Sequence, residues 1–204
     1  MTKKLSKKLL FIIAMLAVVA TLFTACGGDE KDTKDATTTT SSTKDSDSSN
    51  DSSSEDALGL CSLIEKDTVK TAIGTNADNL ADPVSTGVQS LGDGDEGSTC
   101  IFGFDSDSSV NNSFYIDLAK YSESSFKDIS DFTGKSGEDV SGVGDSAKFE
   151  ANESLTGTQE YTITAIKGTN VYLFVISQPK DKVSIDEATA KTALTTIAQS
   201  ASLK

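Results

Sequence analysis

The sequence predicts an α+β domain, with a mainly antiparallel sheet of about five strands and helices packed on it from its N-terminal and C-terminal ends. Residues 161–177 contain two strand-like runs around Gly168, which is typical of a hairpin. Segments 61–74 and 184–201 place apolar residues at helical spacing. Each layer of such a domain buries its apolar face against the other.

The N-terminal helix is predicted within CSLIEKDTVKTAIG, residues 61–74. Ser62 and Glu65 have the spacing of a capping box. Val69, with Ala72 and Ile73, falls on one helical face, and Gly74 would end the helix.

In the middle of the domain the residue pattern predicts a loop that is followed by strands. Residues 75–98 are rich in Gly, Asp and Ser, so we expect a loop there. Strands are expected at 99–104, 113–119 and 147–150. Apolar residues spaced by three (Phe126, Ile129, Phe132) suggest a short helix between the second and third of these strands.

The hairpin is predicted from YTITAIKGTNVYLFVIS, with its turn at Gly168–Asn170. Its second arm, 171–176, is apolar at every position, which predicts a central strand covered on both faces. The C-terminal helix is predicted to start at a capping box of Ser184 and Glu187 and to bury Ala190, Leu194, Ile197 and Ala201.

The composition lowers the expectation of an enzyme. The 204 residues include no histidine and no arginine, and the net charge is −13. Histidine is the usual general base near neutral pH and the commonest zinc ligand. The acidic balance also argues against nucleic acid as a partner, since its backbone requires a cationic surface.

Residues 1–25 are predicted to be a secretory leader. Four lysines precede an apolar run from Leu9 to Phe23, and Thr24 and Ala25 precede Cys26. A transmembrane helix is the alternative, but the apolar run is shorter than the roughly 20 residues that span a bilayer. The ending resembles the lipobox of bacterial lipoproteins, which implies that Cys26 is lipidated and anchors the chain to the outer side of a membrane.

Residues 26–56 are predicted to be a lipid-anchored, disordered linker, and residues 57–204 a single domain. After Cys26, the linker contains no large apolar residue, so it cannot offset the entropy of ordering. The leader carries four lysines, and the linker nine acids against three lysines, which leaves −11 on residues 57–204. The domain itself is therefore acidic.

Two further cysteines remain, Cys61 and Cys100. In an oxidising compartment this even pair predicts a disulfide. Metal binding by two cysteines without histidine is the weaker alternative.

A group of acids around Cys100 offers oxygen ligands, which are those that Ca²⁺ prefers. We treat Asp93, Asp95, Glu96, Asp105 and Asp107 as weak candidates for such a site, since the spacing of an EF-hand is not met. A solvated acidic loop is the simpler interpretation, and no cofactor is expected.

The stretch SGVGDSA at 141–147 suggests a phosphate-binding or nucleophile-presenting loop at first sight. The third glycine of a dinucleotide-binding loop is replaced by Ala147, no Gly-Lys-Ser/Thr follows, and no histidine could activate Ser146. We therefore interpret Gly142, Gly144 and Asp145 as a structural turn.

Several short motifs together resemble an actinobacterial lipoprotein family that is catalogued as a domain of unknown function. They are the lipobox and linker, CSLIEKDTVKTAIG, TCIFGF, VSGVGDSA, KGTNVYLFV and the alanine-rich C-terminal segment. The resemblance implies that Cys61 and Cys100 are the disulfide pair of the family and that Gly142, Gly144 and Asp145 form its turn. It implies a binding or structural role in the cell envelope and carries over no catalytic residue.

The sequence thus favours a non-enzymatic lipoprotein whose domain binds a small ligand or another envelope protein outside the membrane. A Ca²⁺-stabilised module is one alternative. A hydrolase or transferase that uses a carboxylate pair among Asp93, Asp95, Asp105 and Asp145 is another, and it requires two carboxyl groups roughly 5–9 Å apart in a cleft. The strand 171–176 and the loop 141–147 are the places where a pocket would be sought.

Overall fold

The computed structural model describes residues 56–105, 109–130, 133, 135–155 and 157–204. The predicted leader, Cys26 and the linker up to residue 55 lie outside these residues. Within the described part the domain is α+β, as predicted. Its sheet has eight strands, however, rather than about five.

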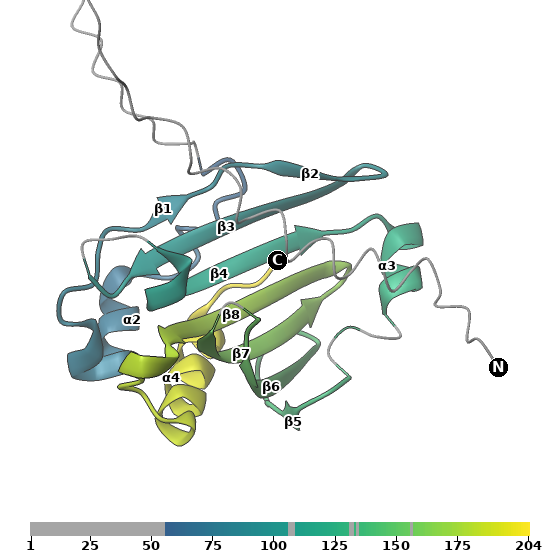
Figure 1. Cartoon of the computed structure of the whole chain (residues 1–204). Coiled ribbons are helices and arrows are strands. Elements are labelled where there is room, and N and C mark those ends of the chain that lie inside the picture. The colour runs from purple at the N-terminus through teal and green to yellow at the C-terminus, as the bar shows by residue number, and fades with distance from the viewer. Residues whose placement is uncertain (1–55, 106–108, 131–132, 134, 156) are drawn as a thin grey trace, which may run out of the picture. The chain divides into compact units, whose positions relative to one another are not determined.

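All strand pairs are antiparallel, and the order across the sheet is β1-β3-β4-β8-β7-β6-β5, with β2 also paired to β3 (Figure 1). The hairpin prediction is confirmed, since β7 and β8 flank a turn at Gly168. The strands are β1 (Val84–Ser85), β2 (Gln89–Gly92), β3 (Asp95–Gly103), β4 (Ser113–Lys120), β5 (Glu138–Asp139), β6 (Ser146–Glu153), β7 (Thr158–Lys167) and β8 (Asn170–Pro179).

The additional strands are the short ones, β1, β2 and β5. β2 and β3 form a hairpin in the segment that the sequence predicted to be a loop. Gly92 pairs with Asp95 around a two-residue turn, in which Asp93 has φ 53° and Gly94 φ 81°. Two positive φ values are what a type I′ hairpin turn requires, and Asp-Gly is among its preferred sequences.

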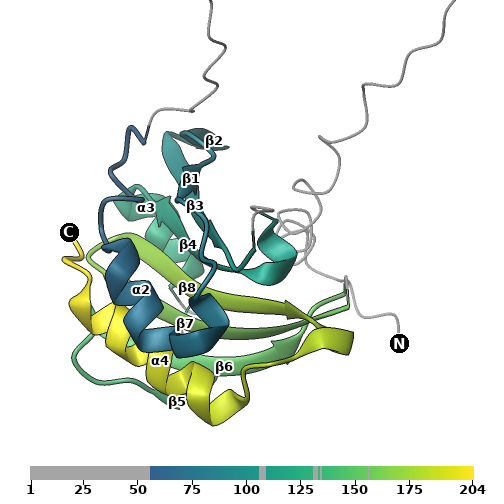
Figure 2. The same ribbon diagram turned by 90° about the vertical axis from the view of Figure 1, so that its left-hand side faces the viewer.

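Two helices, α2 (Lys66–Ile73) and α4 (Glu187–Ser200), pack against each other on one face of the sheet (Figure 2). Val69 and Ile73 of α2 and Leu194 and Ile197 of α4 are buried with Phe114, Ile116, Phe174 and Ile176 of the sheet in one apolar core. The third helix, α3 (Glu123–Ile129), follows β4 and buries no residue. Single 3₁₀ turns lie at Gly74–Ala77 (η2), Val110–Asn112 (η3) and Lys180–Lys182 (η4).

Both predicted capping boxes are wrong. α2 begins after Glu65 without a side-chain cap, and Ser62 Oγ donates instead to Gly59 O, 2.9 Å away. α4 begins after Asp186, whose side chain accepts from Thr189 N at 2.8 Å.

Buried Gln178 explains the later start of α4. Its Oε1 accepts from the backbone N–H groups of Ser184 and Ile185, at 2.9 and 3.0 Å, and from Ser184 Oγ. A buried amide must be satisfied, and this bonding holds Ser184 in the strand-to-helix connection rather than at the helix cap.

The disulfide prediction is confirmed: Cys61 and Cys100 are bonded, with their Cα atoms 5.2 Å apart. Cys100 is fully buried on β3, and the backbone N–H of Cys61 donates to the carboxylate of Asp56 at 2.9 Å. The bond therefore joins the segment that leads into α2 to the core of the sheet. A disulfide fits an extracytoplasmic location.

Among the described residues, no helix has the length and apolarity needed to cross a membrane.

Candidate functional site

The predicted acids occupy separate structural positions. Asp95 starts β3 and accepts from the backbone N–H of Ser122 at 2.8 Å, and this bond lowers the pKa of Asp95. Asp93 lies in the β2–β3 turn and Glu96 is exposed beside it. Asp105 follows the other end of β3 and accepts from Asn112 Nδ2 at 3.0 Å. Asp107 lies outside the described residues.

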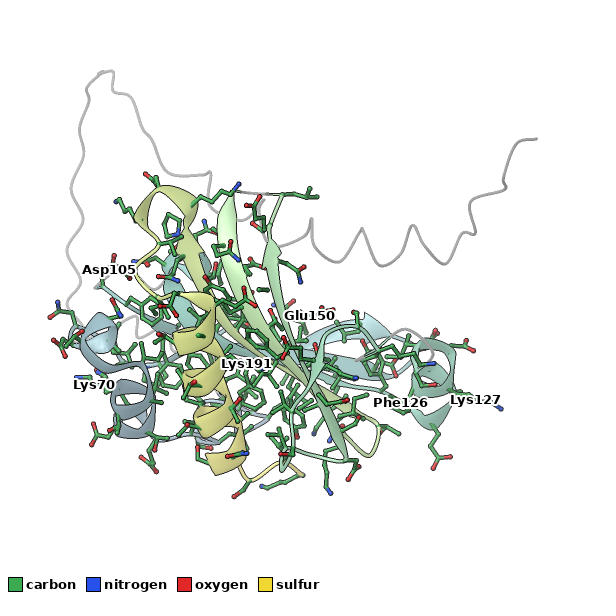
Figure 3. All side chains as sticks on the ribbon, turned by 90° about the horizontal axis from the view of Figure 1, so that it is seen from below. Lys70, Asp105, Phe126, Lys127, Glu150 and Lys191 are labelled. Carbon is green, nitrogen blue, oxygen red and sulfur yellow. A yellow bond between two sulfur atoms is a disulfide. The ribbon has the colours of Figure 1, made fainter. Side chains whose placement is uncertain are left out.

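Asp95, Asp105 and Asp145 are too far from one another to form the carboxylate pair considered from the sequence, while Asp93 and Asp95 lie two residues apart at the β2–β3 turn. Asp95 starts β3 and Asp105 follows its other end, so the rise of about 3.3 Å per strand residue separates them by about 30 Å. Figure 3 shows Asp105 at the opposite end of the domain from Phe126 and Lys127 of α3. Asp145 precedes β6, which is four strand spacings from β3, or on the order of 20 Å. The described ranges contain no group of three or more cysteine, aspartate or glutamate side chains placed to hold a metal ion.

The glycine loop is tied to the β7–β8 hairpin. Gly142 and Gly144 have φ values of 78° and 56°. A Cβ on Gly144 would lie 2.4 Å from the carbonyl oxygen of Ile166. The backbone N–H of Asp145 donates to that oxygen at 2.7 Å, and its carboxylate accepts from Lys167 Nζ and Gly168 N, both at 2.8 Å. These two bonds lower the pKa of Asp145.

The loop therefore uses its polar groups within the fold. Gly144 allows the chain to approach Ile166 closely, and Asp145 anchors the neighbouring hairpin turn. Val143 is buried in the core between the two glycines. This geometry is that of a turn which sets β6 beside β7.

The central strand β8 divides its side chains between two different environments. Tyr172, Phe174 and Ile176 belong to the core beneath α2 and α4. The alternate residues Val171, Leu173 and Val175, which we call the β8 row, point to the other side of the sheet. Val171 and Val175 are buried, but they lie outside the main core. The prediction of a central strand covered on both faces is confirmed, since every residue from 171 to 176 is buried except half-buried Leu173. The helices α2 and α4 cover only one of these faces.

We call the side of the sheet that is turned away from α2 and α4 the open face. Strand alternation and register place on it side chains from five strands. It is more polar than the core, but its middle is apolar. Its members are Thr99 and Ile101 of β3, Tyr115 and Asp117 of β4, the β8 row and Ser177 of β8, Glu160, Thr162 and Thr164 of β7, and Lys148 and Glu150 of β6.

Asp117 is an acid in the middle of this face. It lies opposite Thr99 on one side and Leu173 on the other, and it accepts from Thr99 Oγ1 at 2.6 Å. Burial raises its pKa to about 6, and the charge of Glu160 acts in the same direction. Burial, with Asp117 and Glu160, also raises the pKa of Tyr115. Keeping Asp117 ionised at neutral pH thus costs the free protein stability.

Ser177 is a second costly group on the open face. It is 1% exposed, and its Oγ has no hydrogen-bond partner among the described residues. Its neighbour on β4, Ser113, donates to Val110 O, and its neighbour on β7, Glu160, accepts from Thr158 Oγ1. An unsatisfied buried hydroxyl is uncommon and requires an explanation. Ser177 and Asp117 therefore mark the open face as the candidate binding surface.

Of the residues considered from the sequence, those of the strand 171–176 reach this face through the β8 row. The other described candidates, which are the acids, the two cysteines and the loop at 141–147, are not among its members. The alternation of β4 showed Phe114, Ile116 and Leu118 on one side, which leaves Tyr115 and Asp117 together on the other. A carboxylate beside an aromatic residue on a half-buried strand was the available signal.

Substitution of Asp117 with asparagine is expected to stabilise the protein at pH 7. Asparagine keeps an acceptor for Thr99 and removes the charge. The rise of the pKa to about 6 corresponds to about 3 kcal/mol at 1.36 kcal/mol per pKa unit. Because water still reaches this half-buried side chain, we expect a gain of about 1–2 kcal/mol.

The pH dependence gives the sign of this effect. Folded Asp117 holds its proton more tightly than the unfolded chain, so the wild-type unfolding free energy should fall as pH rises from about 4 to about 6. Urea unfolding of the wild type and of Asp117→Asn from pH 3.5 to 7 measures the difference in their unfolding free energies. The gain of Asp117→Asn should vanish at the acidic end, and a gain that is independent of pH would contradict the account.

Comparisons with protein-family models, with curated proteins and with solved structures found no match to this chain.

Proposed function

We propose that this protein is a lipid-anchored lipoprotein of the cell envelope whose domain, residues 57–204, binds a partner through its open face. The observation that carries the proposal is that this face keeps two groups that reduce the stability of the free protein, Asp117 and Ser177. Groups that cost stability and converge on one surface are typical of functional sites.

The location rests on the sequence of the first 56 residues and on the disulfide. The leader and the ending before Cys26 resemble those of bacterial lipoproteins, and the Cys61–Cys100 bond fits an oxidising compartment. A flexible linker of about 30 residues would separate the domain from the bilayer by roughly 30 Å. This arrangement presents the domain to other components of the envelope, as the likeness to envelope lipoproteins of unknown function also implies.

The anchor is tested by expressing the full chain in a bacterium that processes lipoproteins. We expect the mature protein to begin at an acylated Cys26 and to remain with the membrane fraction. Cys26→Ser should keep its leader and lose the acyl mass. Mass spectrometry of the N-terminal peptide measures both, and an unmodified Cys26 within an intact leader on the wild-type protein would contradict the anchor.

The binding surface is tested by site-specific photo-crosslinking in the same cells. A photoreactive side chain in place of Leu173 on the open face is expected to give a defined adduct. The same side chain in place of Thr192, which is exposed on α4, serves as the matched control. Equal adducts from both positions, or an adduct from Thr192 alone, would argue against the open face.

A further inference from the structure

The charge on the open face is negative, with Asp117, Glu160 and Glu150 against Lys148. Asp117 and Glu160 accept hydrogen bonds from the hydroxyl groups of Thr99 and Thr158, at 2.6 and 3.2 Å. Neither acid takes part in an ion pair within the part of the chain that the structure describes. The lysine of this face, Lys148, is paired with Asp139 at 2.7 Å. The face therefore complements a cationic partner.

Asp117 and Glu160 lie on the two strands that flank β8. Two strand spacings separate β4 from β7, or roughly 10 Å, which is close to the diameter of an α-helix with its side chains. Asp117 lies opposite Leu173 and Glu160 opposite Ser177, so the two acids are offset by about 13 Å along β8. That offset approximates two turns of a helix.

Between the two acids the open face is apolar, with Leu173 and Tyr115 half-buried and Val171 and Val175 buried. The β8 row runs along the middle of the face, with Tyr115 and Ile101 beside it on β4 and β3. A helix lying along β8 would cover this row with its apolar side and bring its flanks to the two acids at once. This is the way in which amphipathic helices are recognised, through anchors that recur at helical spacing.

We propose that the open face binds a basic amphipathic helix of another protein, with lysine or arginine side chains at the carboxylates of Asp117 and Glu160. This inference rests on the proposed function and gives the class of partner. The unsatisfied Oγ of Ser177, beside Glu160, is then a hydrogen-bonding group for the polar flank of that helix.

Two other occupants fit less well. A second copy of the same face would bring Asp117 and Glu160 of both copies together, and like charges across an interface cost affinity. The linker of this chain has no large apolar residue after Cys26 to cover the β8 row, and it is itself acidic.

Titration calorimetry of the detergent-purified full chain tests the inference. The probe is a synthetic helical peptide of leucine and lysine, and the control peptide has glutamate in place of lysine. Asp117→Asn combined with Glu160→Gln is expected to weaken binding of the lysine peptide about tenfold. Asp67→Asn combined with Glu187→Gln makes the same change of charge on α2 and α4 and should leave the affinity within about twofold.

Two further readouts separate binding from folding. Ser177→Ala is expected to weaken binding of the lysine peptide severalfold. It should also raise the melting temperature, because it removes an unsatisfied hydroxyl.

The second readout is the pH dependence of binding. The titratable groups that face Asp117 are Tyr115 on its own strand and Glu160 on β7. As Asp117 ionises between pH 5 and pH 7, the affinity for the lysine peptide should rise severalfold, and Asp117→Asn should flatten that rise.

The outcomes are distinct. Loss of affinity in the open-face variant with retention in the control variant supports the inference. Equal loss in both variants shows that net charge alone attracts the peptide and overturns it, as does the absence of binding. Tighter binding of the glutamate peptide, or a dimer that the open-face variant abolishes, also overturns it. In each of these cases the crosslink from position 173 still tests the proposed function separately.

Discussion

Replacing Cys61 and Cys100 with alanine is expected to lower the free energy of unfolding by about 4 kcal/mol. The bond closes a loop with a sequence separation of 39, and a loop of that length stabilises by about this amount when the unfolded chain is constrained. A domain of this size has a total stability of roughly 5–15 kcal/mol. The loss is therefore a large part of what holds the domain folded.

The position of the bond increases its importance. α2 has only eight residues and no side-chain cap at its start, so it is not stable in isolation. The disulfide holds the segment before α2 against Cys100 in the core, where Leu60 and Ile64 are buried. Without the bond we expect α2 to separate from α4 before the sheet unfolds.

Guanidinium unfolding of the oxidised protein and of the double alanine variant measures the difference. Oxidised wild-type protein treated with a reductant serves as an independent control and should match the variant. A change below about 1 kcal/mol would show that the unfolded chain is already constrained in this region.

Gly144→Ala should destabilise the domain by about 3 kcal/mol or more. Alanine at φ 56° costs roughly 1–2 kcal/mol in backbone strain. Its Cβ would also lie 2.4 Å from the backbone oxygen of Ile166, which must move and lose the bond from Asp145 N. That hydrogen bond contributes about 1 kcal/mol.

Gly168→Ala provides the matched control for this prediction. Gly168 has φ 60°, but a Cβ there would meet no atom within 4 Å. We therefore expect only the cost of the backbone conformation, about 1–2 kcal/mol. Chemical unfolding of both variants separates the cost of the Cβ contact with Ile166, which only Gly144→Ala has, from the cost of alanine at positive φ, which both variants have. If Gly144→Ala folds as stably as Gly168→Ala and instead loses partner binding, the loop is a site rather than a turn.

The strands and helices of the sheet core were predictable because their signals are local. The alternation of Phe114, Ile116 and Leu118 and the turn at Gly168 fixed a strand and a hairpin without knowledge of their neighbours. The β2–β3 hairpin was missed although Asp93-Gly94 is a local turn signal, because its strands are rich in Gly and Asp and lack apolar alternation.

The candidate site was not predictable in the same way. Asp117 and Glu160 are distant in sequence, and only the order β4-β8-β7 brings them to either side of one strand. The run of apolar residues at 171–176 suggested cover on both faces. The choice of a single face by α2 and α4 depends on tertiary packing. The opposite side of that run forms the β8 row, in which Val171 and Val175 are buried and Leu173 is half-buried.

The central claim is that the open face is the surface through which this domain binds. Backbone amide chemical shifts of the ¹⁵N-labelled full chain, recorded during titration with the lysine peptide, test it most directly. We expect the largest shifts at Tyr115, Asp117, Leu173 and Ser177, and little change on the exposed side of α4. Shifts confined to α2 and α4, or to the loop at 141–147, would contradict it.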